Sequence, residues 1–509
     1  MNDAKPDLIV VGGGPGGATL ASLVAMQGHR VSLLEHEIFP RYQIGESLLP
    51  ATVHGICRML GVEDELRKAN FVRKNGAAFR WGKGVEPWLF GFSQARLLDA
   101  IGANYAYQVE RSKFDEILLR NAARLGVRVE EGCKVQKVLR EGDRVVGVQY
   151  VDANDRPYDM RGTFVADASG NGSHIYREVG DRRYSAFFRN IALFGYFEDG
   201  GRLPSPNQGN ILCEAFDKGW IWYIPLSLTP PFLTSVGAVI AHDFVEEIQG
   251  NPETAMRSFI AACPKISGLL ARARRVTEGQ YGKFRVRKDW SYTNERFFSP
   301  GMFLVGDAAC FIDPVLSTGV HLATYSALLA ARSVNSTLRG DVAEATAFTE
   351  FERRYRLEYE TFYRYLIAFY DMHREDDSYF WEARKVLNTA ESANEAFARL
   401  VAGGATDPAV YFRARAGVGD KLQDFADQLG LHVSPEERER LTREMSSALL
   451  GDAKGDRIAG EAGLEDLRSA WQGAVNTDVA ADRHAALEPS SDGCHWVTRP
   501  VGPAPGMAE

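Results

Sequence analysis

The sequence predicts an α/β protein that combines a doubly wound, dinucleotide-binding domain with an antiparallel sheet and a helical C-terminal region. The first observation is a strand–glycine turn–helix–strand pattern at the N-terminus, which is typical of a nucleotide-binding unit. The second is strand-like alternation from about Tyr184 to Ile240, with proline and glycine between the runs. The third is the strongly helical pattern of residues 340–400, which continues in charged sequence to Trp471.

These patterns divide the chain into three parts. Residues 1–375 form the predicted core, into which the antiparallel sheet is inserted at roughly 180–275. Residues 376–472 form a helical C-terminal region. Residues 473–509 are poor in large apolar side chains and rich in alanine, proline, aspartate and glycine, so we expect a loose tail.

The composition excludes several classes of protein. With 509 residues, 45% hydrophobic and 25% charged, the chain reads as a soluble globular protein of more than one ordinary domain. The net charge of −8 and the lack of a basic cluster argue against a nucleic-acid partner. The six cysteines include no C-x-x-C pair, which favours reduced thiols in a cytoplasm and no metal site. No signal peptide is evident at Met1–Leu8, and no apolar run reaches the roughly 20 residues that a membrane span needs.

The elements of the core follow from short apolar runs and the turns between them. A helix is expected at Ala18–Met26, and a β-hairpin is expected with its turn at Gly142-Asp143. The other predicted elements are strands at Leu8–Val11, Val31–Leu34, Thr163–Ala168 and Met302–Val305, and helices at Ser112–Leu125 and Gly319–Leu338.

The N-terminal glycines predict a dinucleotide site. Gly12, Gly14 and Gly17 form G-x-G-x-x-G directly after the first strand. Such glycines allow a tight turn, close approach of the backbone to a pyrophosphate, and contact between helix and strand. The helix start then offers free N–H groups to phosphates. Glu35 ends the second strand, where a carboxylate accepts hydrogen bonds from ribose hydroxyls.

The later sequence favours FAD over a nicotinamide cofactor. The stretch Gly301–Ala309 resembles the flavoprotein element whose aspartate, here Asp307, binds the ribityl or pyrophosphate side of FAD. Pro314 and Gly319 follow, where backbone amides can face the flavin ring. Arg111 stands where flavoproteins of the monooxygenase type place a cofactor-contacting arginine, although a plain surface arginine is equally expected there.

Two further motifs resemble those of the flavin-dependent halogenases. Residues 219–225 read G-W-I-W-Y-I-P and match the family's W-x-W-x-I-P motif. Trp220 and Trp222 are two apart on a predicted strand, so both indoles project from one face. They could pack as an ordinary core pair, or they could separate a flavin from an organic substrate. On the flavoprotein scaffold, the complete motif favours separation.

The second motif contains Lys74, in a segment that resembles the halogenase K-x-G element with its essential lysine. A lone lysine is normally a solvated surface residue, so the assignment depends on its surroundings. Residues 45–50 read G-E-S-L-L-P and resemble the loop that links the flavin pocket with the substrate pocket. We assign Ser47 of this loop, and Arg41 just before it, to the cofactor.

The resemblance implies a fold of the p-hydroxybenzoate hydroxylase type and an oxidoreductase that uses FADH2, O2 and chloride. In this family a flavin C4a-hydroperoxide oxidises chloride to hypochlorous acid, which reaches the lysine and then chlorinates an electron-rich ring. The resemblance assigns catalysis to Lys74, Trp220 and Trp222, and halide binding to the amides of Thr318 and Gly319. The lysine can act as an ammonium hydrogen-bond donor or as an amine that forms a chloramine.

The resemblance also bears on substrate and partners. Leu316 stands where the tryptophan halogenases carry a glutamate, which favours a phenolic or pyrrolic substrate of natural-product biosynthesis, free or tethered to a peptidyl or acyl carrier protein. No second G-x-G-x-x-G unit is apparent, so a separate flavin reductase is expected to supply FADH2. An aromatic stripe at helical spacing is expected to be core, with a docking face as the alternative. It comprises Tyr359, Phe362, Tyr363, Phe369 and Tyr370.

Two other functions stay open at this point. An FAD-dependent aromatic monooxygenase would share the flavin motifs, because the same scaffold serves several reactions. A non-catalytic flavoprotein that binds a carrier protein belongs to a different class. The choice between chloride and bromide is also open.

Overall fold

The computed structural model describes residues 5–81, 86–95, 98–99, 101–371, 402 and 487–498. A six-stranded sheet forms the nucleotide-binding half, and its strands are parallel except at one edge, where β18 is antiparallel to β19. In spatial order the strands are β18 (Phe298–Ser299), β19 (Met302–Leu304), β11 (Phe164–Asp167), β1 (Leu8–Val11), β2 (Val31–Glu35) and β7 (Arg128–Glu131). Every residue of β1 and β2 is buried, as expected of strands covered on both faces.

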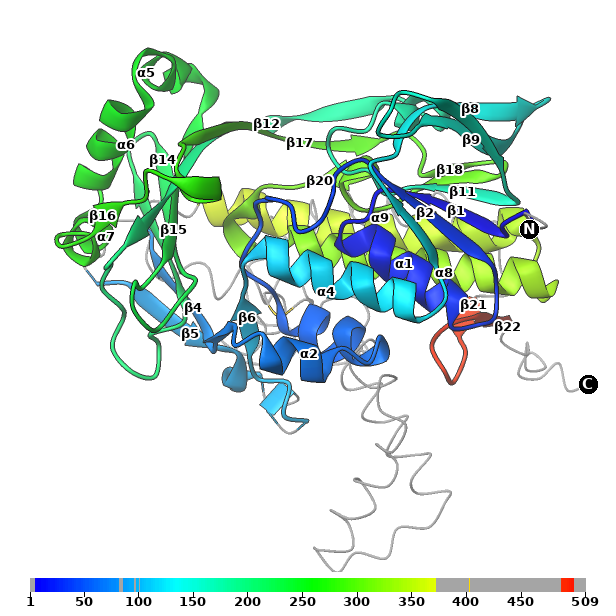
Figure 1. Cartoon of the computed structure of the whole chain (residues 1–509). Coiled ribbons are helices and arrows are strands. Elements are labelled where there is room, and N and C mark those ends of the chain that lie inside the picture. Colours follow the sequence, from blue (N-terminus) through cyan, green and yellow to red (C-terminus); the bar gives the residue numbers. More distant parts are fainter. Residues whose placement is uncertain are drawn as a thin grey trace, which may run out of the picture.

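Helices cover one face of this sheet and a small sheet covers the other (Figure 1). On the helical face α1 packs against both α4 and α8, and α9 packs against α8. The helices are α1 (Pro15–Ala25), α4 (Arg111–Arg124), α8 (Gly319–Arg339) and α9 (Glu344–Asp371). The small sheet contains β8 (Lys134–Glu141), β9 (Arg144–Val151) and β10 (Pro157–Arg161). The predicted strand–helix–strand unit and the hairpin at Gly142-Asp143 are both confirmed.

The second half is built on a nine-stranded, mainly antiparallel sheet. Its path is β20 (Cys310–Phe311), β17 (Arg285–Asn294), β12 (Arg182–Glu198), β15 (Thr234–Ala241), β14 (Gly219–Pro225), β13 (Ile211–Phe216), β4 (Gly76–Arg80) and β5 (Trp88–Gly91), and β16 (Arg274–Arg275) pairs with β12. The predicted alternation at Tyr184–Ile240 corresponds to β12–β15. The sheet nevertheless extends beyond the predicted insertion of roughly 180–275, because strands from before and after it add to both edges.

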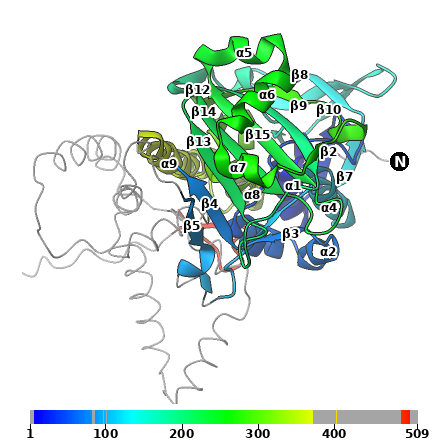
Figure 2. The same cartoon turned by 90° about the vertical axis from the view of Figure 1, so that its left-hand side faces the viewer.

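Three short helices lie across the outer face of this sheet (Figure 2). They are α5 (Val245–Gly250), α6 (Pro252–Ala261) and α7 (Pro264–Leu269). Met256 and Phe259 of α6 are buried against sheet residues such as Ile221 and Val236, which makes a second, smaller hydrophobic core. This packing leaves the opposite face of the sheet directed at the nucleotide-binding half.

The remaining elements connect the two halves. A π-helix (Ala51–Cys57), α2 (Glu63–Lys68) and the two-stranded pair β3 (Val72–Lys74) and β6 (Ala106–Gln108) lie between α1 and β7 along the chain. Single 3₁₀ turns occur at Phe92–Gln94, Ile175–Glu178, His242–Phe244, Gly279–Tyr281, Gly306–Ala308 and Pro314–Leu316. All six cysteines are unpaired and buried, so the expectation of free thiols is confirmed. Within the described residues no helix is long and apolar enough to cross a membrane.

The C-terminal tail differs from the prediction. Within residues 473–509, which we expected to be loose, β21 (Leu487–Pro489) and β22 (Trp496–Thr498) form a hairpin against α8. Trp496 is 1% exposed, and its Nε1 donates a 2.9 Å hydrogen bond to Oγ of Ser333. A few apolar side chains therefore anchor an otherwise polar stretch. Apart from Ala402, which is buried, the predicted helical region 376–472 lies outside the described residues.

Candidate active site

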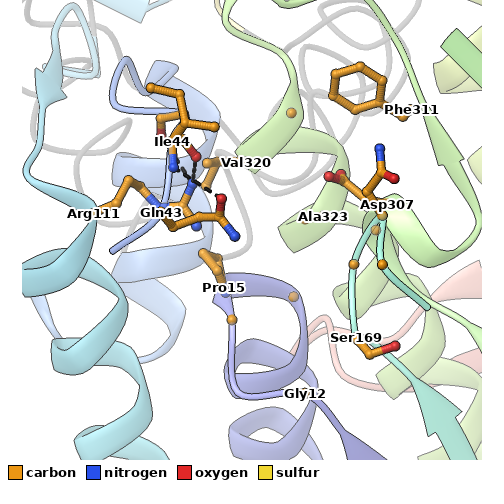
Figure 3. Close-up of a pocket in the computed structure, with 18 of the residues that line it drawn as sticks. Gly12, Pro15, Gln43, Ile44, Arg111, Ser169, Asp307, Phe311, Val320 and Ala323 are labelled. Atoms are coloured by element: carbon orange, nitrogen blue, oxygen red, sulfur yellow. Dashed lines mark hydrogen bonds between the residues drawn. The ribbon is translucent and has the colours of Figure 1, made fainter. Parts of the chain in front are cut away.

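A cavity of about 560 Å³ lies between the two halves. Gly12 and Glu35, at the carboxyl ends of β1 and β2, line one end, and Trp220 and Trp222 of β14 line the sheet side. The carboxyl edge of a parallel sheet is where nucleotides bind in doubly wound folds. Figure 3 shows Gly12 at the base of this cavity, with Arg111 and Asp307 on opposite sides.

Most of the predicted site residues meet in the lining of this one cavity. The lining residues that the sequence singled out are Gly12, Gly14, Glu35, Arg41, Ser47, Arg111, Trp220, Trp222, Asp307, Pro314 and Gly319. Three predicted residues are not among those that line the cavity: Gly17, Lys74 and Thr318. A Cβ on Gly17 would lie 1.9 Å from the carbonyl oxygen of Gly12, so this glycine serves the contact between helix and turn.

The glycine turn fits a dinucleotide. Gly12 has a φ of +105°, and a Cβ there would lie 2.5 Å from the carbonyl oxygen of Ala168. The turn leads into α1, which begins at Pro15. The backbone amides in the first turn of this helix are free to face a phosphate. The Glu35 carboxylate closes the turn, because its Oε2 accepts a 2.5 Å hydrogen bond from the Gly13 amide. An open backbone with a carboxylate beside it is the donor and acceptor set that an ADP-ribose moiety requires.

Arg111 is held rigidly in the cavity wall. It is 7% exposed and makes two hydrogen bonds to Asp115, of 2.7 and 2.8 Å. A third bond of 2.6 Å reaches the carbonyl of Ile44, and Arg41 joins the same aspartate at 2.8 Å. The alternative of a plain surface arginine is therefore wrong. Two cations around one buried carboxylate leave this wall suited to an anionic group.

Lys74 is buried, which excludes the alternative of a solvated surface lysine. Its side chain is 1% exposed, and Nζ donates a 3.0 Å hydrogen bond to the carbonyl oxygen of Leu48. The ring of Phe92 lies 5.6 Å from the nitrogen. Burial lowers the pKa of Lys74 to about 7. Leu48 follows the cavity-lining Ser47, so the amine contacts the same short loop segment that lines the cavity.

The two tryptophans share a face, as their spacing predicts. Their ring centroids are 6.1 Å apart at an angle of 53°, and both line the cavity. Trp220 Nε1 donates a 2.6 Å hydrogen bond to the hydroxyl of Tyr370, and Trp222 Nε1 donates one of 3.2 Å to Ser235. Each indole is thus fixed by a hydrogen bond as well as by packing.

The aromatic stripe of α9 is mainly core, with one exception that the sequence did not reveal. Tyr359, Phe362 and Phe369 are buried. Tyr370 instead takes part in the site, because its hydroxyl donates a 2.7 Å hydrogen bond to Oδ2 of Asp313. Asn190 donates to the same oxygen at 3.0 Å. Burial raises the pKa of Asp313 to about 6.

Asp313 begins the segment to which halide binding is assigned. Its Oδ1 accepts a 3.1 Å hydrogen bond from the amide of Val315, and Ser317 then takes a left-handed conformation with φ of 62°. Thr318 is fully buried and Gly319 begins α8, a helix of 21 residues. The first-turn amides of such a helix lack intrahelical acceptors and favour an anion.

Sequence reasoning also missed a hydrogen-bonded cluster beside the cavity. Glu46, in the cavity wall, accepts a 2.8 Å hydrogen bond from the Tyr196 hydroxyl, which lies 2.8 Å from the hydroxyl of Tyr42. The G-E-S-L-L-P motif contains Glu46 and was the available signal. Its tyrosine partner lies 150 residues away and has no local signature.

Comparison with known proteins agrees with this geometry. The sequence profile of the tryptophan halogenase family matches residues 7–102 and 98–415. A tryptophan 2-halogenase from Chondromyces crocatus is 35% identical over 409 residues, covering 78% of this chain and 75% of that protein. A 1H-pyrrole-2-carbonyl peptidyl-carrier-protein chlorinase from Pseudomonas fluorescens is 29% identical, and the match covers 73% of this chain and 84% of that protein. The solved structure of the myxobacterial chondrochloren halogenase, a variant of FAD-dependent halogenases, is 49% identical, with a TM-score of 0.73, and covers 97% of this chain and 99% of that chain.

Proposed function

The chain belongs to the flavin-dependent halogenase family, whose members are enzymes, and from this premise we propose that it chlorinates an electron-rich aromatic ring. The observation that carries the proposal is the burial of Lys74 beside the loop that lines the flavin cavity. A lysine amine is expensive to bury, so its place there calls for a role other than solubility.

The residues present fit FAD. Gly12, Gly14 and the start of α1 would hold the pyrophosphate, Glu35 the ribose, and Arg111 and Asp307 the remainder of the cofactor. When bound and reduced, the flavin supplies the electrons with which O2 converts a halide ion into an electrophilic halogen species. A separate flavin reductase would deliver the reduced cofactor.

The protein's own part begins with the halide. Thr318 and Gly319 would hold chloride through backbone N–H groups at the start of α8, where the helix dipole favours an anion. Trp220 and Trp222 would keep the aromatic substrate out of the flavin cavity, since both indoles are fixed in its wall. Only a small oxidant would then reach Lys74.

Lys74 would activate that oxidant for transfer to the ring. As an ammonium it can donate a hydrogen bond to the oxygen of hypochlorous acid, and as a neutral amine it can accept the chlorine. A pKa of about 7 leaves both forms populated at neutral pH. Either role requires the amine to be shielded from bulk water, which would otherwise compete for the oxidant.

A phenolic or pyrrolic substrate of natural-product biosynthesis, free or attached to a carrier protein, is supported by two observations. Leu316 is buried at the position where tryptophan halogenases carry a glutamate, so that acid cannot assist a free tryptophan here. One relative acts on a pyrrole that is bound to a peptidyl carrier protein.

Mass spectrometry of reactions with FADH2, O2 and chloride tests the proposal, using candidate phenols and pyrroles in free and carrier-bound form. The expected product shows the isotope pair of one added chlorine. Lys74→Ala should abolish that product while flavin oxidation continues. Lys113→Ala, at a lysine that is 57% exposed, is the matched control and should behave like the wild type. An oxygenated product that persists in Lys74→Ala would instead indicate an aromatic monooxygenase.

A further inference from the structure

The cavity wall contains a buried carboxyl group, that of Glu46, in the loop that also contacts Lys74. Glu46 is 2% exposed, and its Oε1 accepts a 2.8 Å hydrogen bond from the hydroxyl of Tyr196. Its Oε2 is also buried, and the Ser235 hydroxyl interacts with the carboxyl group. One carboxyl oxygen is therefore tied to the Tyr196 hydroxyl, and a rotation of the carboxyl group would turn its proton toward the cavity.

The hydrogen bond from Tyr196 is the inner part of a longer chain. The Tyr196 side chain is buried, and its hydroxyl lies 2.8 Å from the hydroxyl of Tyr42. Tyr42 is a partly exposed residue. Because Tyr196 donates its only proton to Glu46, Tyr42 must be the donor to Tyr196. The result is a directed series of hydrogen bonds that runs from the hydroxyl of a partly exposed tyrosine to the cavity wall.

The surroundings of Glu46 keep its proton exchangeable. Burial raises the pKa of Glu46 to about 7, against the opposing influence of the Tyr196 hydroxyl and the Arg111 charge. Glu110, at the start of α4, adds a like charge, and the Ser235 hydroxyl of β15 also faces the carboxyl group. Glu46 is therefore present as both acid and carboxylate near neutral pH, which suits a group that delivers and recovers protons.

The stoichiometry of halogenation consumes one proton in each turnover, which such a group can supply. One FADH2, one O2, one chloride ion, one proton and one aromatic C–H give FAD, one aryl chloride and two water molecules. The two hydrogens of FADH2 and the hydrogen of the ring supply only three of the four hydrogens in the two waters. The fourth must come from solvent in every turnover, and a buried acid in the cavity wall can supply it while cofactor and substrate occupy the cavity.

We propose that Glu46 delivers this proton and that Tyr196 and Tyr42 replace it from the surface, an inference that rests on the proposed function. The carboxyl group of Glu46 rotates so that its protonated oxygen faces the cavity, and that oxygen releases the proton to the oxygen that becomes water. The other carboxyl oxygen then takes the Tyr196 hydroxyl proton, Tyr196 takes the Tyr42 proton, and solvent returns a proton to Tyr42. The next rotation presents the newly protonated oxygen to the cavity. No oxidant or further reactant is needed for these transfers.

Infrared spectroscopy of the protein without flavin tests the acid directly. We expect the wild type to show the C=O band of a protonated carboxyl group that fades as pH rises through the neutral range. Because burial also raises the pKa of Asp313, the test is the difference between the two spectra, and Glu46→Gln should lack the contribution of Glu46. A wild-type spectrum that has no such band, or one that Glu46→Gln leaves unchanged, would overturn the proposal. This measurement needs neither halide nor substrate, so its failure is distinct from a failure to find a halogenated product.

Product formation tests the delivery route. Glu46→Gln should slow chlorination by about 100-fold or more, the range of general acid catalysis. Tyr196→Phe and Tyr42→Phe should slow it less, and both should show a steeper loss of rate with rising pH and a changed solvent isotope effect. Tyr281→Phe is the matched control, because its ring lies 4.2 Å from that of Tyr196 while its hydroxyl bonds to Glu110. If Tyr281→Phe reproduces the effects of Tyr196→Phe, these effects come from packing or from the charge of Glu110 and not from proton transfer, and the route is refuted.

Discussion

The Nε1 of Trp220 donates a 2.6 Å hydrogen bond to the hydroxyl of Tyr370, and the same hydroxyl donates to Asp313 at 2.7 Å. This arrangement joins the tryptophan motif on β14, the last turn of α9 and the segment that precedes α8. The indole that would separate flavin from substrate is therefore fixed by the residue that also orients the proposed halide segment. A change at Tyr370 should affect both.

Tyr370→Phe should free the Trp220 indole without emptying the site. The buried Nε1 and the Asp313 carboxylate each lose a partner, which should lower the free energy of unfolding by about 1–3 kcal/mol. We expect less chlorinated product per flavin oxidised, measured by mass spectrometry beside flavin absorbance. The control is Tyr363→Phe on the same helix, whose hydroxyl bonds to Ser185 at 2.8 Å. Equal coupling of product to flavin oxidation in both variants would show that the bond to Trp220 is dispensable.

Gly14→Ala should separate folding from cofactor binding. A Cβ at this position would have Arg41 Nη2, at 3.5 Å, as its nearest contact, so the protein should fold normally. The added methyl group would enter the space next to the proposed pyrophosphate, and the Kd for FAD should rise by about tenfold or more, which corresponds to about 1.4 kcal/mol. Fluorescence titration measures this affinity. Gly268→Ala, where a Cβ meets no atom within 4 Å, should bind FAD like the wild type.

The buried amine makes the stability of the protein depend on pH. The pKa of Lys74 is about 7 in the folded protein and 10.5 in a model lysine. Between these values the unfolded chain holds a proton that the folded protein lacks, so stability rises with pH. Relative to Lys74→Met, the wild type should gain up to about 1.4 kcal/mol per pH unit from pH 7 upward and nothing below it. Urea unfolding at several pH values measures this, and a constant difference across that range would contradict the burial.

The C-terminal hairpin should contribute strongly to stability. Trp496 is 1% exposed, and the guanidinium groups of Arg332 and Arg354 lie 5.2 and 5.0 Å from its ring. Trp496→Ala should lower the free energy of unfolding by about 3–5 kcal/mol, as expected for a buried tryptophan. Val497→Ala, at a neighbour that is 44% exposed, should change it by less than about 0.5 kcal/mol. A small effect of Trp496→Ala in thermal or denaturant unfolding would mean that the hairpin is not part of the cooperative fold.

The features that could be predicted from the sequence are those encoded locally. The turn at Gly12 and Gly17 follows from glycine spacing, and the common face of Trp220 and Trp222 follows from the two-residue period of a strand. The burial of Lys74 was expected only through the family motif. Physically it depends on the pairing of β3 with β6, where Lys74 lies opposite Ala106, and pairing across such a distance leaves no mark in the local pattern.

The remainder of the site consists of partners that the chain brings together from far apart. Tyr196 and Glu46 are separated by 150 residues, and neither residue type predicts the other. Tyr370 was placed with the core because its spacing matched its buried neighbours, while its hydroxyl was the informative group. The hairpin at residues 487–498 was missed because one or two apolar side chains in a polar stretch carry little weight in a composition argument, although each can fill a specific hole.

The burial of the cysteines bears on how long such an enzyme can keep working. Thiols react with electrophilic halogen mainly as exposed thiolates. Here every cysteine is covered, and burial raises the pKa of Cys57 and Cys310 to about 12. Oxidant that escapes the site therefore meets no ready sulfur nucleophile among these six thiols. Loss of activity during prolonged turnover should begin at other side chains, and added thiol should slow that loss by consuming the oxidant that has escaped.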